Sequence, residues 1–368
     1  MQTLAAGLAL FIVASAPLPG QWLKYKTPGI PRTADGKPDL TASAPKMPDG
    51  KPDLSGIWEA NTGGYGVNVA ADLKPGEVKE WADALYRQRS ENLSIDYPGF
   101  RCLPNIGPIL SFDTSKILQT PDVIAFLSYD GTYRQILMDG RGLPVDPNPT
   151  WQGYSVGHWD GDTLMVESAG FNDKTWLDYG GHPHTEQLRV TERFHRKDFG
   201  HIDLSVTFDD PKAYMRPWTI SMVMDLVPDT ELLEYVCNEN ERDIQHFVVT
   251  EEDRKKTRGV KVDAAILSKY AGLYQFVDDQ GRPVDREGKP AEPDAKPELY
   301  TVLLTDNQLQ LQPPGSTSGF PLTPESDTKF TLAGQLLEFV TDGQGAVTHL
   351  VLHIVEGDRK AIRKSNLQ

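Results

Sequence analysis

The stretch that decides the fold runs from residue 180 to residue 194 and reads Gly180-Gly181-His182-Pro183-His184-Thr185-Glu186-Gln187-Leu188-Arg189-Val190-Thr191-Glu192-Arg193-Phe194. At the two-residue period of a β-strand, these residues divide between two faces. Leu188, Val190 and Phe194 share the even face, and their apolar character directs that face toward a core. Glu192 lies on the same inward face. An inward carboxylate among apolar side chains is costly unless it is paired or used, so this row predicts either a structural ion pair or a functional site.

The same alternation recurs along much of the chain. Strand-like runs are predicted at residues 115–120, 122–129, 132–138, 152–159, 163–168, 186–196, 200–208, 214–226 and 231–238, after a first strand that begins at 55–58. Their connections carry hairpin signals, namely Asp130-Gly131, Asp139-Gly140, Asp160-Gly161 and Phe199-Gly200. Short strands with tight turns predict an all-β fold whose main unit is a lipocalin-like or calycin-like antiparallel β-barrel with a ligand-sized interior. A two-sheet sandwich is the alternative.

Composition divides the chain into successive parts. We expect a leader at 1–20, an extended Pro-rich arm at 21–55, the barrel domain at 56–249, a charged linker at 250–263 and a second, small antiparallel β domain at 264–368. In the arm, the sequence of residues 35–40 recurs at 49–54, which predicts two successive turns. One helix is predicted at about 75–92, and a charged insert at 278–296 interrupts the second domain.

Export is predicted from the leader and from the cysteines. The apolar run Leu4–Ala14 is followed by small residues to Ala16, as in a secretory signal peptide that is removed, which indicates a periplasmic or secreted protein. The segment before the run lacks Lys and Arg, and a buried apolar helix is the alternative. In an oxidising compartment Cys102 and Cys237 would form a disulfide, whereas two free buried thiols are the other possibility.

Charge restricts the class of partner. The chain carries 52 acidic against 37 basic residues and a net charge of −15, which argues against binding to a nucleic-acid backbone. No segment after the leader is long and apolar enough to cross a bilayer. A small-molecule ligand is therefore the expected partner, and the oligomeric state is left open.

Two kinds of chemistry are candidates around the decisive stretch. His182, His184 and Glu186 alternate as ligands on one side of a strand would, so they are a candidate site for a divalent metal such as zinc, iron or manganese. Pro183 and the preceding glycines favour a simple turn instead. Glu192 is the candidate general base or acid, with His184 as its partner; a structural pairing of Glu192 with an inward Arg, Tyr or Trp is the alternative.

Several further residues are candidates for ligand binding. Arg134, Tyr154 and His158 could face the same space as Glu192. The loop just before the histidine pair contributes Asn172, Trp176, Asp178 and Tyr179, whose polar and aromatic groups suit a barrel mouth, although ordinary packing at the barrel end would also use them.

Gly153-Tyr154-Ser155-Val156-Gly157 matches the G-x-S-x-G nucleophile motif. That motif needs a strand, a strained turn and then a helix, and the residues that follow here predict another strand. We therefore do not expect Ser155 to act as a nucleophile.

The C-terminal part, about 264–366, resembles the small lipocalin-like module appended to many bacterial β-lactamase-like and peptidase proteins. The resemblance rests on Leu273-Tyr274, Leu309-Gln310-Leu311, Phe320-Pro321-Leu322-Thr323-Pro324-Glu325-Ser326, Lys329-Phe330, Leu337-Glu338-Phe339 and Val347-Thr348-His349-Leu350-Val351-Leu352-His353. It implies a small antiparallel β module and carries over no catalytic residue.

The larger part is similar to a group of uncharacterised secreted bacterial proteins. The similar stretches lie at residues 31–40, 146–151, 161–164 and 170–178. This similarity implies export and a β-rich fold, without a reaction.

Two functions remain open for an exported, ligand-binding protein of this kind. One is an enzyme that carries out proton transfer, such as a lyase, isomerase or hydrolase, with Glu192 as base and His184 as its partner or as a metal ligand. The other is a non-catalytic binding protein for a lipid, a terpene or a saccharide fragment.

Overall fold

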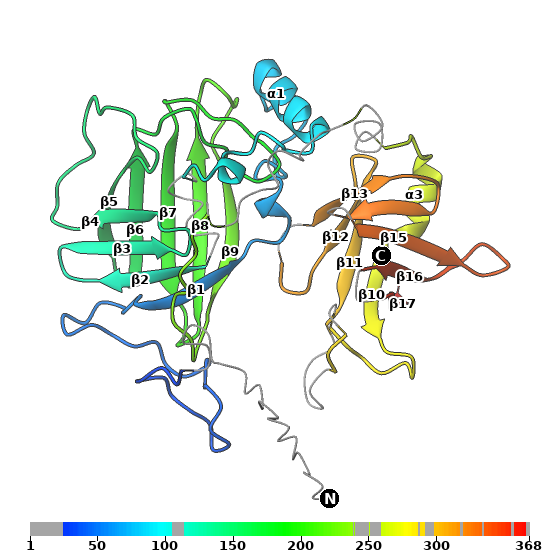
Figure 1. The fold of residues 1–368 in the computed structure, drawn as a ribbon, viewed down its shortest axis with the longest axis horizontal. Helices are drawn as coiled ribbons and strands as arrows, with labels where there is room; N and C mark the ends of the chain where they lie inside the picture. Colours follow the sequence, from blue (N-terminus) through cyan, green and yellow to red (C-terminus); the bar gives the residue numbers. More distant parts are fainter. Residues whose placement is uncertain are drawn as a thin grey trace, which may run out of the picture.

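The computed structural model describes residues 25–104, 114–237, 239, 250, 259–285, 288–290, 298–316, 319–332, 335–354 and 357–365. The predicted leader lies outside the described residues, as do most of the predicted linker and parts of the insert at 278–296. The described part folds into two closed β-barrels, which lie side by side in Figure 1. The all-β prediction is confirmed, and the sandwich alternative is wrong.

Nine strands close the first barrel in chain order. They are β1 (Gly56–Asn61), β2 (Ser115–Gln119), β3 (Val123–Ser128), β4 (Tyr133–Leu137), β5 (Tyr154–Asp160), β6 (Thr163–Ala169), β7 (Arg189–Arg196), β8 (His201–Asp209) and β9 (Trp218–Leu226). Every neighbouring pair is antiparallel except β4 and β5, which are parallel. The short strands β2, β3 and β4 run across the direction of the long strands β6 to β9 (Figure 1).

Most of the predicted strands of this barrel are confirmed, and the differences have clear causes. The hairpin predicted at Asp139-Gly140 is wrong, because the chain leaves β4 there and returns only at Tyr154 to run parallel to β4. The strand predicted at 231–238 is also wrong: residues 231–236 contain no strand, since β9 already closes the barrel by pairing with β1.

The period-two alternation of β7 has the predicted orientation. Val190, Glu192 and Phe194 are fully buried, whereas Arg189 and Arg193 are exposed. The inward side chains of β6 to β9 belong to one apolar core that fills the barrel; they include Leu164, Val166, Val190, Phe194, Ile202, Leu204, Val206, Phe208, Ile220, Met222 and Met224. The predicted ligand-sized interior is therefore wrong for these strands, because their inward side chains fill the space.

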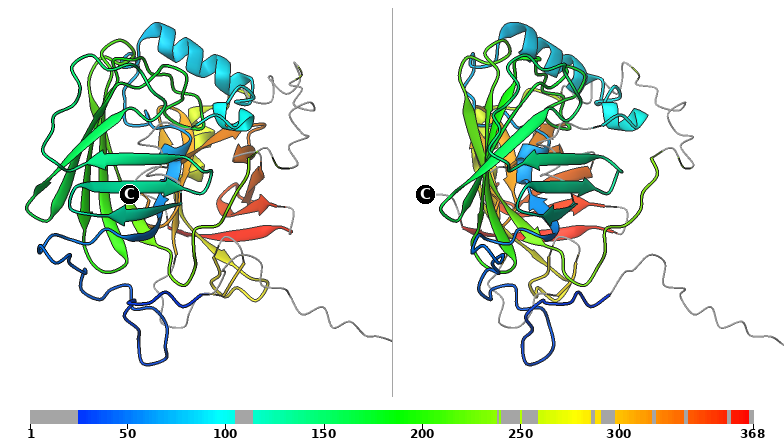
Figure 2. Two further views of the ribbon diagram at one scale, coloured as in Figure 1. Left: turned by 60° about the vertical axis from the view of Figure 1, so that its left-hand side comes forward. Right: turned by 90° about the vertical axis from the view of Figure 1, so that its left-hand side faces the viewer.

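Both ends of the first barrel are covered. Helix α1 (Glu80–Glu91) and the short 3-10 helices η1 (Gly63–Gly66) and η2 (Pro98–Arg101) lie at one end, together with the 170–185 loop (Figures 1 and 2). The arm lies at the other end, in dark blue. Its two repeats form the same tight turn, since Asp39 N donates to Pro31 O as Asp53 N donates to Pro45 O. The prediction of two successive turns is confirmed, and the predicted helix begins at Glu80 instead of about residue 75.

Cys102 and Cys237 form the predicted disulfide, with a sequence separation of 135 residues. It joins the segment after η2 to the segment that follows β9. No cysteine of the chain is free.

The second barrel is closed and antiparallel throughout, and it has a core of its own. An unpredicted helix, α3 (Ala264–Tyr270), precedes its strands β10 (Gly272–Val277), β11 (Tyr300–Thr305), β12 (Gln308–Gln312), β13 (Phe320–Pro324), β14 (Lys329–Leu332), β15 (Gln335–Thr341), β16 (Val347–His353) and β17 (Arg359–Ser365). The barrels meet closely at η1, where a Cβ added to Gly64 would lie 2.1 Å from the carbonyl oxygen of Gly319. Only glycine fits this contact. Among the described residues, no helix is long and apolar enough to span a membrane.

Candidate functional site

Four consecutive strands bring polar side chains together inside the first barrel. Ser155 of β5 and Ser168 of β6 are direct cross-strand partners, and Glu192 of β7 projects inward beside them. Arg134 of β4 reaches this group because Arg134 and Ile136 share the inward face of their strand. All four side chains are at least 95% buried, so the group lies in a low-dielectric interior.

Arg134 holds the group together. Its Nη1 donates to Glu192 Oε1 at 3.0 Å, and its Nη2 donates to Glu192 Oε2 as well as to Ser168 Oγ at 2.8 Å. Its Nε donates to Ser155 Oγ at 3.0 Å. This forked geometry satisfies the Glu192 carboxylate on both oxygens. The structural alternative, in which Glu192 pairs with an inward Arg, is thus the arrangement in the structure, and both carboxylate oxygens accept hydrogen bonds from Arg134.

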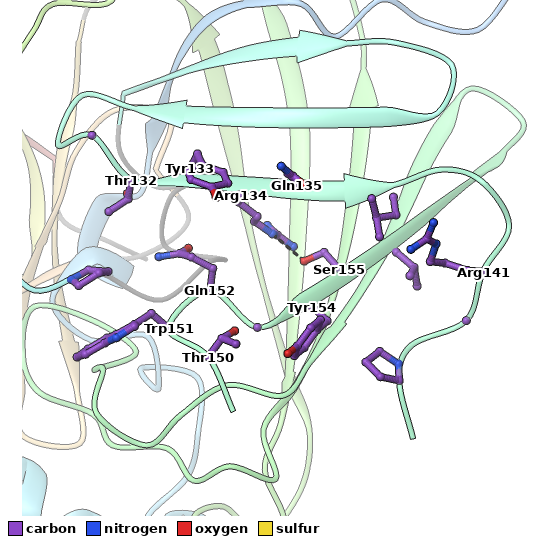
Figure 3. A pocket seen from close by; sticks show the side chains of 17 residues that line it. Thr132, Tyr133, Arg134, Gln135, Arg141, Thr150, Trp151, Gln152, Tyr154 and Ser155 are labelled. Carbon is purple, nitrogen blue, oxygen red and sulfur yellow. Dashed lines mark hydrogen bonds between the residues drawn. The ribbon is translucent and has the colours of Figure 1, made fainter. Parts of the chain in front are cut away.

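A pocket opens through the barrel wall above this group. Strands β4 and β5 pair over only two residue pairs, Ile136 with Ser155 and Leu137 with Val156, and they diverge on the N-terminal side of these pairs. Figure 3 shows the gap, with Thr132, Tyr133 and Gln135 on one side and Thr150 to Tyr154 on the other. The resulting cavity has a volume of about 710 Å³. We call it the seam pocket.

The seam pocket combines apolar walls with a polar floor. Tyr133, Tyr154 and Trp151 supply aromatic surface, and Leu137 and Val156 supply aliphatic surface. The floor and rim present polar groups from Arg134, Ser155, Gln135, Gln152, Thr150, Thr132 and Arg141. A concave site with apolar walls and a few placed polar groups is typical of small-molecule binding.

The expected binding residues are only partly in this pocket. Tyr154 lines it, with its hydroxyl donating to the Asn148 carbonyl at 3.1 Å. His158 is exposed on β5 and does not line it. The sequence did not point to Tyr133, Trp151 and Gln152, which also line the pocket. They line it because β4 and β5 pair in parallel over a short length, and the register of that pairing is not set by local sequence.

The other expected residues cover the α1 end of the barrel. Asp178 accepts hydrogen bonds from the backbone of Val69 at 2.7 Å and of Gly181 at 2.8 Å, and its Oδ2 lies 2.5 Å from His182 Nδ1. The His182 ring stacks on Tyr86 with centroids 3.8 Å apart. Asp178 therefore ties the loop to the segment that follows η1.

The remaining loop side chains are also engaged by their neighbours. Trp176 is buried beneath the guanidinium of Arg89, 4.4 Å from the ring centroid, and burial lowers the pKa of Arg89 to about 10. The buried Asn172 accepts a hydrogen bond from Lys174 N. Tyr179 packs edge-on against Tyr97 and lines a second, smaller cavity of about 330 Å³ beside the disulfide.

His184 is buried and hydrogen-bonded on both ring nitrogens. Nδ1 lies 3.2 Å from the Thr185 carbonyl, which can only accept, so Nδ1 carries the proton. Nε2 then accepts from the Thr175 hydroxyl at 2.7 Å. Burial lowers the pKa of His184, which keeps the ring neutral.

The candidate metal ligands do not converge. His182 is directed to Asp178 and His184 to Thr175, while Glu186 is exposed on a separate surface groove. Within the described ranges, no three His, Cys, Asp or Glu side chains lie close enough together to hold a metal ion.

Ser155 lies at the second position of a regular strand, and the chain continues through β5 into a hairpin. Its Oγ accepts from Arg134 and lies 2.8 Å from Ser168 Oγ. This placement differs from the strand–turn–helix that a G-x-S-x-G nucleophile needs.

A scan against protein-family models finds no match to this chain, and a search of curated proteins finds none either. The similarity of the C-terminal part to a lipocalin-like module, and of the larger part to secreted bacterial proteins, stays a prediction. The candidate site rests on its geometry.

Proposed function

We propose that the chain is an exported protein that binds a small organic ligand in the seam pocket. The observation that carries this proposal is the cavity of about 710 Å³, bounded by aromatic side chains and floored by the Arg134 group. Cavities of this size enclose drug-sized molecules. Tyr133, Trp151 and Tyr154 would contact a flat apolar body, and Gln135 and Gln152 would contact its polar groups.

Binding without proton transfer is the better-supported function. Acid–base chemistry would use Glu192 or His184, and both are held by buried partners within the fold. Proton transfer needs a group within hydrogen-bonding reach of the reacting atom. The exposed groups that line the pocket are instead amides, hydroxyls and the Arg141 guanidinium, which can recognise a ligand.

A neutral flat probe tests the proposal. We expect 2-naphthamide to bind the full chain with a Kd of roughly 0.1–1 mM, as judged by saturation-transfer NMR. Val156→Trp should abolish this binding by filling the pocket, while Ser205→Trp on the exposed face of β8 should leave it intact. No saturable binding, or equal binding to both variants, would rule out the seam pocket as the ligand site.

The disulfide supports export, because such bonds persist in oxidising compartments. We propose that the leader at 1–20 is removed and that the protein is periplasmic or secreted. Mass spectrometry of the protein produced from the full sequence should find an N-terminus near residues 17–21. A chain that stays in the cytoplasm with Met1 would contradict export.

A further inference from the structure

The charged side chains that line the seam pocket are opposite in sign to the net charge of the chain. The molecule has 52 acidic residues and a net charge of −15, yet the 17 described residues that line the pocket include two arginines and no Asp or Glu. The part of the pocket lining that the structure describes therefore carries cationic side chains and no carboxylate, and it would repel an anion less than the acidic surface elsewhere does.

The buried ion pair is oriented with its positive end toward the pocket. Arg134 lines the cavity, whereas Glu192 does not, because the carboxylate lies one strand beyond Ser168, on β7. Figure 3 shows Arg134 extending from β4 toward Ser155 at the floor. A ligand group in the cavity would therefore be closer to the guanidinium than to the carboxylate, and the pair would act on it as a dipole.

One further cation lines the pocket, and another lies near one of its lining residues. Arg141 lines the pocket and pairs with Asp139, which is not a lining residue; its Nε lies 2.9 Å from both carboxylate oxygens of Asp139. Lys174 Nζ lies 5.9 Å from the ring centroid of Trp151, a lining residue. Asp139 thus offsets the charge of Arg141 from outside the cavity.

We infer that the ligand of the seam pocket is an organic anion: a carboxylate or similar group attached to a flat apolar body. This inference rests on the proposed function. The aromatic walls would hold the apolar body, and the anionic group would accept hydrogen bonds from the exposed Arg141 at the rim. The buried Arg134 would act on it only through its charge.

Three probes that share a ring system test this inference by isothermal titration calorimetry on the full chain. They are 2-naphthoate, neutral 2-naphthamide and cationic 2-naphthylmethylammonium. At low salt we expect 2-naphthoate to bind roughly tenfold more tightly than 2-naphthamide, and the cation to bind most weakly. The preference should shrink as the salt concentration rises, because exposed charges at the rim are screened.

Variants at the rim test whether Arg141 causes the preference for the anionic probe. Arg141→Gln should weaken binding of 2-naphthoate by about threefold to fivefold and leave 2-naphthamide unchanged. Asp139→Asn should strengthen 2-naphthoate binding, since Arg141 then lacks its counter-charge while an Asn at this turn can still accept from Arg141 N. Arg193→Gln, on the exposed face of β7, is the matched control and should change neither affinity.

The outcomes separate the two proposals. If 2-naphthamide binds and 2-naphthoate binds no more tightly, the anion inference is wrong and the ligand pocket stands. A cation that binds as tightly as the anion would also overturn the inference. If none of the three probes binds, the pocket itself is rejected and the inference with it.

Discussion

Arg134 and Glu192 carry opposite charges in the packed interior of the first barrel, so each depends on the other. Glu192→Gln keeps the shape of the side chain and removes its charge, which would leave the Arg134 guanidinium buried without a counter-ion. We expect the free energy of unfolding to fall by about 3–5 kcal/mol, as measured by urea denaturation. Glu167→Gln, at an exposed position on β6, should change it by less than about 0.5 kcal/mol.

A double variant distinguishes the cost of an unpaired charge from a general loss of packing. Arg134→Met with Glu192→Leu removes both charges and keeps apolar volume, so it should recover most of the lost stability. A single Glu192→Gln variant as stable as the parent chain would mean that the pair contributes nothing to the fold.

His184 gives stability a pH dependence whose sign follows from its burial. Burial lowers the pKa of His184 below 6.5. Above pH 6.5 the ring is therefore neutral in both the folded and the unfolded chain, and the free energy of unfolding loses nothing to protonation of His184. As the pH falls below 6.5, the unfolded chain takes up a proton that the folded chain does not, and stability is lost by up to about 1.4 kcal/mol per pH unit.

Denaturation at a series of pH values checks this contribution. His184→Gln should show a smaller loss of stability than the parent chain between about pH 7 and pH 5. His158→Gln, at an exposed position on β5, should keep the slope of the parent. An unchanged slope in His184→Gln would contradict a neutral, buried His184.

The inward position of Glu192 could be read from the sequence, and Arg134 was one of several candidates for the same space, but the pairing itself could not be fixed. Period-two alternation fixes the face of a residue on its own strand, because only local backbone geometry is involved. The pairing with Arg134 depends on how β4 is placed relative to β7 across two intervening strands, and that register is set by the closed barrel.

At the scale of elements, the junction between β4 and β5 has the fewest paired residues of the strand junctions in the first barrel. It has two residue pairs, against eight between β7 and β8, and it is the one parallel pair. Few ladder hydrogen bonds and an adjoining cavity favour local opening. We expect those amides of 136–137 and 155–156 that face the β4–β5 junction to exchange with deuterium roughly tenfold or more faster than those of 191–194, measured by NMR. Equal protection of the two regions would mean that the junction is as rigid as the long sheet.

Most strands were predictable, and the element that creates the pocket was not. Long runs such as 200–208 alternate strongly, so their type and inward face follow from local pattern. Asp139-Gly140 carries the local signal of a hairpin, which would return the chain antiparallel to β4. In the structure, the next strand, β5, runs parallel to β4 instead. Only the closure of the whole barrel imposes that direction.

At the scale of the molecule, the two barrels have separate cores. The apolar core of the first runs from Leu54 to Leu226 in the chain, and that of the second from Val262 to Ala361, with no residue in common. The disulfide lies wholly within the first unit. We therefore expect two cooperative transitions in calorimetry of the full chain, one for each core.

Removal of the disulfide should act on only one of these transitions. A 135-residue loop freed in the unfolded chain corresponds to about 5 kcal/mol in the chain-entropy model. For a unit of this size, Cys102→Ser with Cys237→Ser should lower the Tm of the first barrel by roughly 10–20 °C. The Tm of the second barrel should not change, because the disulfide lies in the first unit and the two barrels have no core residue in common. The parent chain in reductant should coincide with the double variant. A single transition that shifts as a whole would show instead that the close contact at Gly64 and Gly319 couples the two barrels into one folding unit.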